Sequence, residues 1–200
     1  MAILIQIILA YLLGSIPSGV WLGKALYGKD IRDYGSGNTG ATNTFRILGM
    51  KAGTIALILD VLKGLVATLI PIYFNTPIHP IFIGLFAILG HVFSLYINFQ
   101  GGKAVATSAG VLLALHPLYL MGAVVFFLIV LFVTSTVSIA SISASIAAAF
   151  TSVFLDDPIF SAVVFLIALA IIYLHRENIQ RIRAGNESRV PFGLNPKKEE

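Results

Sequence analysis

Long apolar segments dominate this chain and restrict the environment in which it can fold. A helix needs roughly 20 apolar residues to cross the hydrocarbon core of a bilayer. Seven segments meet or approach that length, at residues 3–23, 52–74, 79–97, 103–115, 118–133, 138–154 and 159–175. Hydrophobic residues make up 58% of the 200 residues and charged residues only 11%, unlike an ordinary soluble domain. The sequence predicts an all-α, polytopic membrane protein with seven transmembrane helices in a single domain, residues 1–200.

The fourth and fifth segments are short and are separated by His116 and Pro117. One bent or re-entrant element in place of two spans is therefore the alternative to the seven-helix count.

Positive charges are unevenly distributed between the two sides that a seven-helix count defines. The connections near residues 75–80, 116–117 and 156–158 contain no Lys or Arg. The other connections and the carboxyl end contain Lys24, Lys29, Arg32, Arg46, Lys51, Lys103, Arg176, Arg181, Arg183, Arg189, Lys197 and Lys198. By the positive-inside rule this second side is cytoplasmic, so the amino terminus lies outside and the tail of residues 184–200 inside. The asymmetry explains the formal charge of +4 without a nucleic-acid partner.

A glycine-rich stretch, GSGNTGATN at residues 35–43, lies on the predicted cytoplasmic side, with Arg46 just beyond it. Gly35, Gly37 and Gly40 allow backbone conformations in which successive N–H groups converge on an anion. Neutral polar side chains add further donors at Ser36, Asn38, Thr39, Thr42 and Asn43. The stretch predicts an oxyanion site, with a solvated turn as the alternative. Neither a Walker motif nor a dinucleotide fingerprint is present.

A second candidate anion site lies in GHVFSLYINFQGGKAVAT. Gly101 and Gly102 precede Lys103 and an apolar run follows, so Lys103 is predicted to stand in the first turn of a helix. Free N–H groups at a helix start favour an anion, and a lysine adds a full charge. The alternative is a loop lysine that extends to the lipid headgroups. His91 is either a buried histidine bonded to a neighbouring helix or a direct substrate contact.

Two ionisable residues, Asp60 and Lys63, lie inside the second segment. Helical rise places them about 14 Å and about 18 Å from Lys51. Ionisable groups at such a depth are candidates for function. A spacing of three residues puts them on one helix face, where they neutralise each other. We therefore favour a structural pair over a direct catalytic role.

Small and hydroxyl residues recur at helical spacing in two segments. Ser15, Gly19 and Gly23 are four residues apart, a pattern that lets helix backbones approach closely. Ser138 and Ser141 belong to a polar stripe on the sixth segment. Contacts between helices are the ordinary interpretation of such serines, and substrate contact stays open for these two.

The last segment ends in the basic sequence HRENIQRIRAGNE. Basic helices at a membrane boundary commonly bind anionic lipids. His175, Asn178 and Arg181 fall near one helix face by their spacing of three. Lipid binding requires neither His175 nor Asn178, so both are candidates for a substrate site. The chain has no Cys, which excludes thiolate catalysis and thiolate metal sites.

Taken together, these stretches resemble the PlsY family of bacterial membrane acyltransferases. The resemblance rests on GSGNTGATNTFR, LDVLKG, GHVFSLYINFQGGKAVAT and HRENIQRIRAGNE, in this order along the chain. Thr39, Ser94 and Ala104 depart from the Pro, Pro and Gly that are usual in the family. The resemblance implies seven membrane helices, an outside amino terminus and an active site at the cytoplasmic face of the cell inner (plasma) membrane.

The implied reaction transfers a fatty acyl group from acyl phosphate to the sn-1 hydroxyl of sn-glycerol 3-phosphate. The products are lysophosphatidic acid and phosphate, in the first acylation step of bacterial phospholipid synthesis. Neither acyl-CoA nor acyl carrier protein is expected as donor, and no cofactor or metal is expected. Because both substrates carry a phosphate, the reaction agrees with two anion sites on one side. The expected partners are these substrates and membrane lipids, and the protein is expected to be a monomer.

The predicted site draws on all of these motifs. The expected catalytic residues are Ser36, Arg46, Lys103 and His175. The expected substrate-binding residues are Gly35, Gly37, Asn38, Gly40, Thr42, Asn43, Gly101, Gly102, Ser141 and Asn178. Arg46 and Lys103 would neutralise phosphate charge, and His175 and Asn178 would orient glycerol phosphate. The acceptor of the hydroxyl proton is either His175 or an oxygen of a substrate phosphate.

Two other classes of protein share some of these features. A carrier of a phosphorylated solute also needs anion sites and polar residues within its spans. Such a carrier is expected to place a site near mid-bilayer, whereas the polar clusters here lie on one side. A noncatalytic scaffold of a lipid-synthesising complex is the third alternative.

Overall fold

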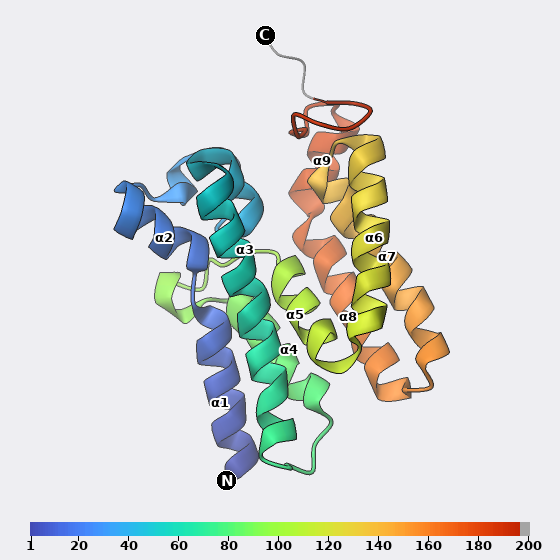
Figure 1. Ribbon diagram of the computed structural model, residues 1–200. Helices are drawn as coiled ribbons and strands as arrows, with labels where there is room; N and C mark the ends of the chain where they lie inside the picture. Colours follow the sequence, from blue (N-terminus) through green and yellow to red (C-terminus); the bar gives the residue numbers. More distant parts are fainter. Residues whose placement is uncertain (197–200) are drawn as a thin grey trace. The chain divides into compact units, whose positions relative to one another are not determined.

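The structure is a computed structural model that describes residues 1–196, and within that range it contains helices, turns and loops but no β-strand (Figure 1). Lys197 and Lys198, which we assigned to the cytoplasmic tail, lie outside the described residues. The helices are α1 (Ala2–Ser15), α2 (Ser18–Tyr27), η1 (Ile31–Asp33), α3 (Ala41–Tyr73), α4 (Pro80–Val92), η2 (Leu95–Ile97), α5 (Val105–Leu115), α6 (Pro117–Thr134), α7 (Val137–Ser152), η3 (Val153–Leu155), α8 (Pro158–Leu174) and α9 (Arg176–Arg183). The chain forms two compact units, which divide after Pro117 and are described separately below.

The apolar segments predicted from sequence all coincide with helices. Among the described residues, four helices are long and apolar enough to cross a membrane, or up to six when each of two bent pairs counts as one span. The helix α5 has only 11 residues and falls short of a full span. The structure therefore supports a helical membrane protein with four to six candidate spans.

The first predicted span is broken in two. The helices α1 and α2 meet at an angle of 45° at Ile16 and Pro17. Pro17 has no N–H group to donate and clashes with a continuing helix, which accounts for the break. Residues 3–23, predicted as one span, thus correspond to a bent pair of helices, and the predicted close approach at Gly19 and Gly23 is confirmed. A Cβ atom on Gly19 would lie 2.3 Å from Thr44 Oγ1, and one on Gly23 would lie 2.6 Å from the Lys29 carbonyl oxygen.

The helix α3 is interrupted at Gly49, whose φ of +82° is strongly disfavoured for other residues. The residues before Gly49 form a short piece that folds back onto the long remainder. Gly53 permits this, because a Cβ atom there would lie 2.3 Å from the ring of Phe45. The predicted second segment, residues 52–74, thus corresponds to the long part of α3, and the short piece positions the glycine-rich stretch.

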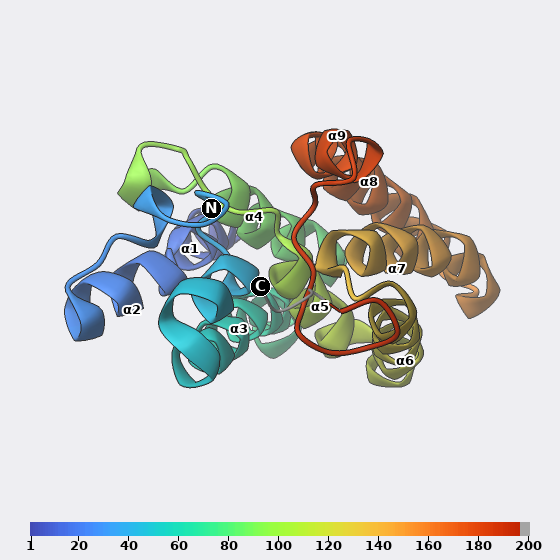
Figure 2. The ribbon, with the colours of Figure 1, turned by 90° about the horizontal axis from the view of Figure 1, so that it is seen from above.

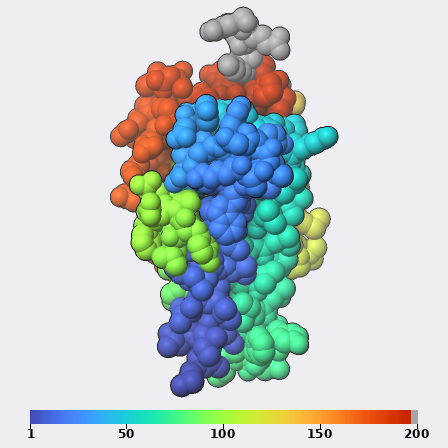
Figure 3. Space-filling model, turned by 90° about the vertical axis from the view of Figure 1, so that its left-hand side faces the viewer, coloured from blue at the N-terminus to red at the C-terminus, as the bar shows by residue number. Residues whose placement is uncertain are grey.

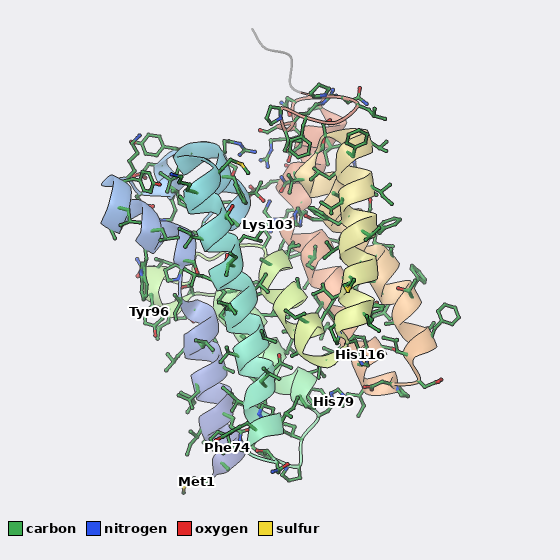
Figure 4. The ribbon with its side chains drawn as sticks, in the orientation of Figure 1. Met1, Phe74, His79, Tyr96, Lys103 and His116 are labelled. Atoms are coloured by element: carbon green, nitrogen blue, oxygen red, sulfur yellow. The ribbon has the colours of Figure 1, made fainter. Side chains whose placement is uncertain are left out.

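Unit 1, residues 1–117, is held together by close contacts between helix backbones. The helices α1 and α4 meet where a Cβ atom on Gly14 would lie 2.1 Å from the Ala87 carbonyl oxygen. The helices α3 and α5 meet in the same way at Gly64, 2.1 Å from the Thr107 carbonyl oxygen. Small residues are the usual device for packing helices in lipid, where dispersion contacts replace the hydrophobic effect. Figure 4 shows Lys103 toward the end of this unit that lies opposite Met1 and Phe74.

Unit 2, residues from 118 onward, contains most of α6 together with α7, η3, α8 and α9. Hydrogen bonds link its helices, since Ser161 Oγ donates to the Ser152 carbonyl at 2.9 Å and Tyr119 donates to the Ala148 carbonyl. The chain after α9 returns to the end of α6, where the Val190 and Leu194 N–H groups donate to Ser135 and Phe132 at 2.8 Å each. These bonds fix the carboxyl-terminal segment against its own helices.

We predict that Gly64→Ala destabilises the protein by about 1–3 kcal/mol, because the new methyl group forces α3 away from α5. The measurement is thermal unfolding in detergent followed by circular dichroism. Gly122→Ala is the matched control, since a Cβ atom there meets nothing within 4 Å. In the α6 helix it is expected to be neutral or to stabilise by up to about 1 kcal/mol. Equal melting temperatures for the two variants would contradict the close-contact interpretation.

Candidate active site

The glycine-rich stretch is organised around the side chain of Asn43, which is 1% exposed. Its Oδ1 atom accepts a hydrogen bond from the Ser36 N–H at 3.0 Å. Its Nδ2 group lies within hydrogen-bonding distance of the carbonyls of Ile31, Tyr34 and Asn38, at 2.8, 3.2 and 3.0 Å. Asn43 therefore shapes the loop from inside, and its amide is occupied by loop carbonyls.

We expected the backbone N–H groups of the glycine-rich stretch to converge on an anion. For three of these groups the expectation is wrong, because they donate hydrogen bonds within the loop. The Ser36 N–H donates to Asn43, the Gly37 N–H to the Tyr34 carbonyl at 3.1 Å and the Gly40 N–H to Asn38 Oδ1 at 3.0 Å. Gly35 and Gly37 nevertheless suit this loop, because their φ values of +62° and +68° favour glycine. The physical reason for the difference is that a folded loop satisfies its own donors first.

The groups that remain available to an anion lie around the start of α3. Ser36, Thr42 and Arg46 are exposed. Thr42 and Arg46 are four residues apart in the first piece of α3 and so share a helix face. The N–H groups of the first turn of a helix also favour a negative charge nearby. The structure thus presents a hydroxyl pair and a guanidinium at the start of this helix.

Neighbouring basic residues are neutralised by Asp30. Arg32 Nη2 lies 2.6 Å from Asp30 Oδ2, and Lys24 Nζ lies 3.1 Å from the same oxygen. The hydrogen bond from Arg32 holds the pKa of the Asp30 carboxyl well below its ordinary value of 3.8. Asp30 is consequently ionised at neutral pH and offsets one of the two positive charges of Arg32 and Lys24.

The second candidate loop, residues 93–104, folds back onto the end of α4. The Gly101 N–H donates to the Val92 carbonyl and the Gly102 N–H to the His91 carbonyl, both at 3.0 Å. These N–H groups therefore cap α4, and the expectation that they face an anion is wrong. Glycine is needed at both positions because a Cβ atom on Gly101 would lie 1.9 Å from the His91 carbonyl oxygen, and one on Gly102 would lie 2.3 Å from His91 Nε2.

Lys103 is half-buried and precedes α5 instead of standing in its first turn. The helix begins at Val105, and its N-cap residue Ala104 has a left-handed backbone with φ of +57°. A left-handed residue ends helical geometry on its amino-terminal side, which accounts for the shift from the predicted start. The same φ explains why glycine is usual at this position in the family that the sequence resembles.

Ser94 is the other residue of this loop that departs from that family, in which proline is usual here. Ser94 Oγ donates a hydrogen bond to the Ser15 carbonyl at 2.5 Å, a bond that proline cannot make.

The two loops of unit 1 lie side by side (Figure 2). Buried Val20, Ile31 and Ile97 form one apolar cluster that joins α2, η1 and η2. The segment near residue 100 also lies against α1 and α2 on the face shown in Figure 3. A small cavity with room for a water centre, about 10 Å³, is bordered by Thr39 from the first loop and Gly101 from the second. The structure thus brings the two predicted anion-binding segments together.

In unit 2, Glu187 joins several of the predicted residues. Glu187 Oε1 accepts hydrogen bonds from Ser138 Oγ at 2.8 Å and from Asn178 Nδ2 at 2.6 Å. Glu187 Oε2 accepts one from Arg181 Nε at 2.7 Å. Burial opposes ionisation of this carboxyl, but these hydrogen bonds outweigh it and lower its pKa below the ordinary value of 4.5. Sequence reasoning gave Glu187 no role, although it is a lone acidic residue that follows a run of basic ones.

His175 stands at the break between α8 and α9, where the helix direction changes by 54°. It is 4% exposed, and its Nδ1 atom lies 2.8 Å from the Ile171 carbonyl oxygen. A carbonyl only accepts, so Nδ1 carries the proton and Nε2 is the basic nitrogen of the neutral ring. Ser141 is also buried, one turn beyond Ser138 on α7.

Fold and chemistry together define a helical integral membrane protein whose polar loops suit a phosphorylated ligand. A family model described as glycerol-3-phosphate acyltransferase matches residues 4–185. The chain belongs to this family, known as PlsY, and is an acyltransferase.

Curated relatives and solved structures agree with this assignment. The glycerol-3-phosphate acyltransferase of Streptococcus thermophilus (strain CNRZ 1066) is 52% identical over 98% of this chain and 96% of its own length. The corresponding protein of Enterococcus faecalis is 48% identical over 99% of this chain and 96% of its own length. A crystal structure of the integral membrane enzyme PlsY (YgiH) in its glycerol 3-phosphate form has a TM-score of 0.90 at 39% identity, covering 95% of this chain and 96% of that one. Its lysophosphatidic acid form has a TM-score of 0.86 at 38% identity, covering 94% of this chain and 95% of that one. The acyltransferase interpretation is therefore favoured over the carrier and the scaffold.

The hydrogen bonds of Glu187 predict a pH dependence of stability. A carboxyl with a lowered pKa in the folded state stabilises fully above its unfolded pKa, and this contribution is lost as the pH falls through the folded value. Melting temperatures of the wild type and of Glu187→Gln should therefore differ most at neutral pH and converge below about pH 4.5. A difference that stays constant from pH 7 to well below pH 4.5 would contradict the ionised carboxylate.

Proposed function

We propose that this enzyme transfers the acyl group of an acyl phosphate to the sn-1 hydroxyl of glycerol 3-phosphate, without a cofactor and as a monomer. The observation that carries the proposal is the meeting of two loops that supply Ser36, Thr42 and Arg46 on one side and Lys103 on the other. Both substrates carry a phosphate, and the products are a phosphate ester and inorganic phosphate; guanidinium and ammonium groups are suited to bind such oxyanions. Relatives named glycerol-3-phosphate acyltransferase and a PlsY structure in a glycerol 3-phosphate form support the acceptor.

In the proposed step, the sn-1 oxygen attacks the acyl carbonyl carbon and forms the ester bond, while the bond from that carbon to the phosphate oxygen breaks. Inorganic phosphate leaves with the bonding electrons. The hydroxyl proton passes to an oxygen of a substrate phosphate or to His175 Nε2. Because a mixed anhydride is already activated, holding the two groups together can supply about 7–11 kcal/mol at best. Each donor aimed at the developing oxyanion adds about 3–4 kcal/mol.

The predicted residues take distinct roles in this proposal. Ser36, Asn38 and Thr42 donate to a phosphate, and Arg46 and Lys103 neutralise its charge. The remaining members of the first loop, Gly35, Gly37, Gly40 and Asn43, give the loop its shape, while Gly101 and Gly102 hold Lys103 at the end of α4. In unit 2, His175 and Asn178 orient glycerol 3-phosphate, with Ser141 as an adjoining contact.

We predict that Lys103→Ala and Arg46→Ala each lower kcat/KM by about a hundredfold or more, since each removes a charge that stabilises the transition state. The assay mixes detergent-purified protein with palmitoyl phosphate and glycerol 3-phosphate and measures release of phosphate and formation of the 1-acyl product. Lys51→Ala is the matched control, because Lys51 is an exposed cation on the same helix as Arg46. Normal rates for both site variants would refute their roles, and equal rates with palmitoyl-CoA would refute the donor.

We also propose seven membrane spans in one domain in the cell inner membrane, with the amino terminus outside and the active site at the cytoplasmic face. The natural absence of Cys makes this simple to test. A cysteine introduced by Asn75→Cys should react in intact cells with a membrane-impermeant maleimide, whereas one introduced by Asn186→Cys should react only after permeabilisation. The reverse labelling pattern would overturn the proposed orientation.

A further inference from the structure

A buried ionic cluster, made of Asp60, Lys63, His91 and Ser18, lies beneath the two loops of unit 1. Lys63 Nζ is 2.8 Å from Asp60 Oδ1, and both side chains are 3% exposed. Ser18 Oγ donates to the same carboxylate oxygen at 3.0 Å, and His91 Nδ1 lies 3.8 Å from it. The predicted pairing of Asp60 with Lys63 is confirmed, whereas its preferred structural role stays a prediction.

The ionic cluster is connected to segments that lead to the loops of the proposed site. Lys63 Nζ donates to the Ile16 carbonyl at 3.0 Å, which fixes the break between α1 and α2. His91 contacts the second loop in two ways. Its carbonyl accepts a hydrogen bond from the Gly102 N–H, and its ring packs so closely on Gly102 that a Cβ atom there would lie 2.3 Å from Nε2. Thr39, from the first loop, borders the same small cavity as Asp60 and His91.

Stability alone does not account for a buried ion pair at this place. Removing two charges from water costs about as much as their mutual attraction returns, so apolar residues of similar size would hold the helices at least as well. The helices α1 and α4 are already joined by the close contact at Gly14, and α3 and α5 by the one at Gly64. The charges instead constrain how the joined segments are oriented, since hydrogen bonds to a carboxylate and from an ammonium have preferred geometry.

We propose that Asp60 and Lys63 are positioning residues that set the two anion-binding loops at the separation that the reacting groups require. The inference rests on the proposed site in those loops. Neither residue touches the substrates in this proposal. Asp60 and Lys63 act through Ser18, Ile16 and His91 on the backbone that carries Thr39 and Lys103. A displacement of about 1 Å between reacting groups can cost about a hundredfold in rate, so a small shift of either loop is enough to be measured.

The test replaces both charges at once by Asp60→Leu/Lys63→Met, which leaves no unpaired buried charge. We expect the double variant to keep its melting temperature, to lose about tenfold or more in kcat/KM per folded molecule, and to bind glycerol 3-phosphate more weakly by calorimetry. Ser18→Ala is the second variant. It keeps both charges, removes one hydrogen bond, and is expected to weaken glycerol 3-phosphate binding about threefold or more.

Gln6→Leu/Thr76→Val is the matched control. It removes a polar pair of unit 1, in which Gln6 Nε2 donates to Thr76 Oγ1 at 2.6 Å, from the end opposite the loops. This control should keep wild-type kcat/KM. Wild-type kcat/KM and affinity in a folded Asp60→Leu/Lys63→Met variant would overturn the inference, as would wild-type affinity in Ser18→Ala if the double variant fails to fold. Lys103→Ala, measured in parallel, tests the proposed site itself, so the two failures are distinguishable.

Discussion

The need to satisfy every backbone polar group near the membrane governs the local structure of this enzyme. Lipid offers no hydrogen bonds, so a helix that ends close to the hydrocarbon region must find protein partners for its last carbonyls. At the end of α4 these partners are the N–H groups of Gly101 and Gly102, and around η1 the partner is the amide of Asn43. The loops with the proposed catalytic residues are therefore tied directly to helix ends. Glycine and asparagine serve here to keep the backbone satisfied while Lys103 and Arg46 are held nearby.

Most of the helical architecture could be predicted, because an apolar run long enough for a membrane has few alternatives to a helix. The helices α6 and α8 begin and end within one residue of the predicted segments 118–133 and 159–175. The structure departs from the expected helices where a local backbone feature decides the outcome. Pro17 breaks the first segment, and the left-handed Ala104 moves the start of α5 beyond Lys103. Such features depend on φ values that hydropathy does not encode.

The motifs of the candidate site could be found from sequence, but the roles of their individual groups could not. A stretch rich in glycine and amides contains many donors, and only the folded loop shows which of them are already used. Ser36, Gly37 and Gly40 donate their N–H groups within the loop. In the proposed site, side chains and the start of α3 therefore bind the anion. Glu187 was missed because its partners Ser138 and Asn178 come together only through the tertiary structure of unit 2.

The buried charges and the proposed chemistry depend on each other in a simple way. In the proposed reaction the acyl phosphate needs no strong nucleophile from the protein, so catalysis would rely on the placement of two phosphates and one hydroxyl. A membrane helix bundle that packs through glycine contacts fixes helix axes well, but nonpolar packing alone leaves loops at its ends less defined. We propose that the directional hydrogen bonds of Asp60 and Lys63 hold the loops in position close to Thr39 and Gly101. In our proposal, this ion pair adds little to the free energy of folding and instead improves the geometry of the site.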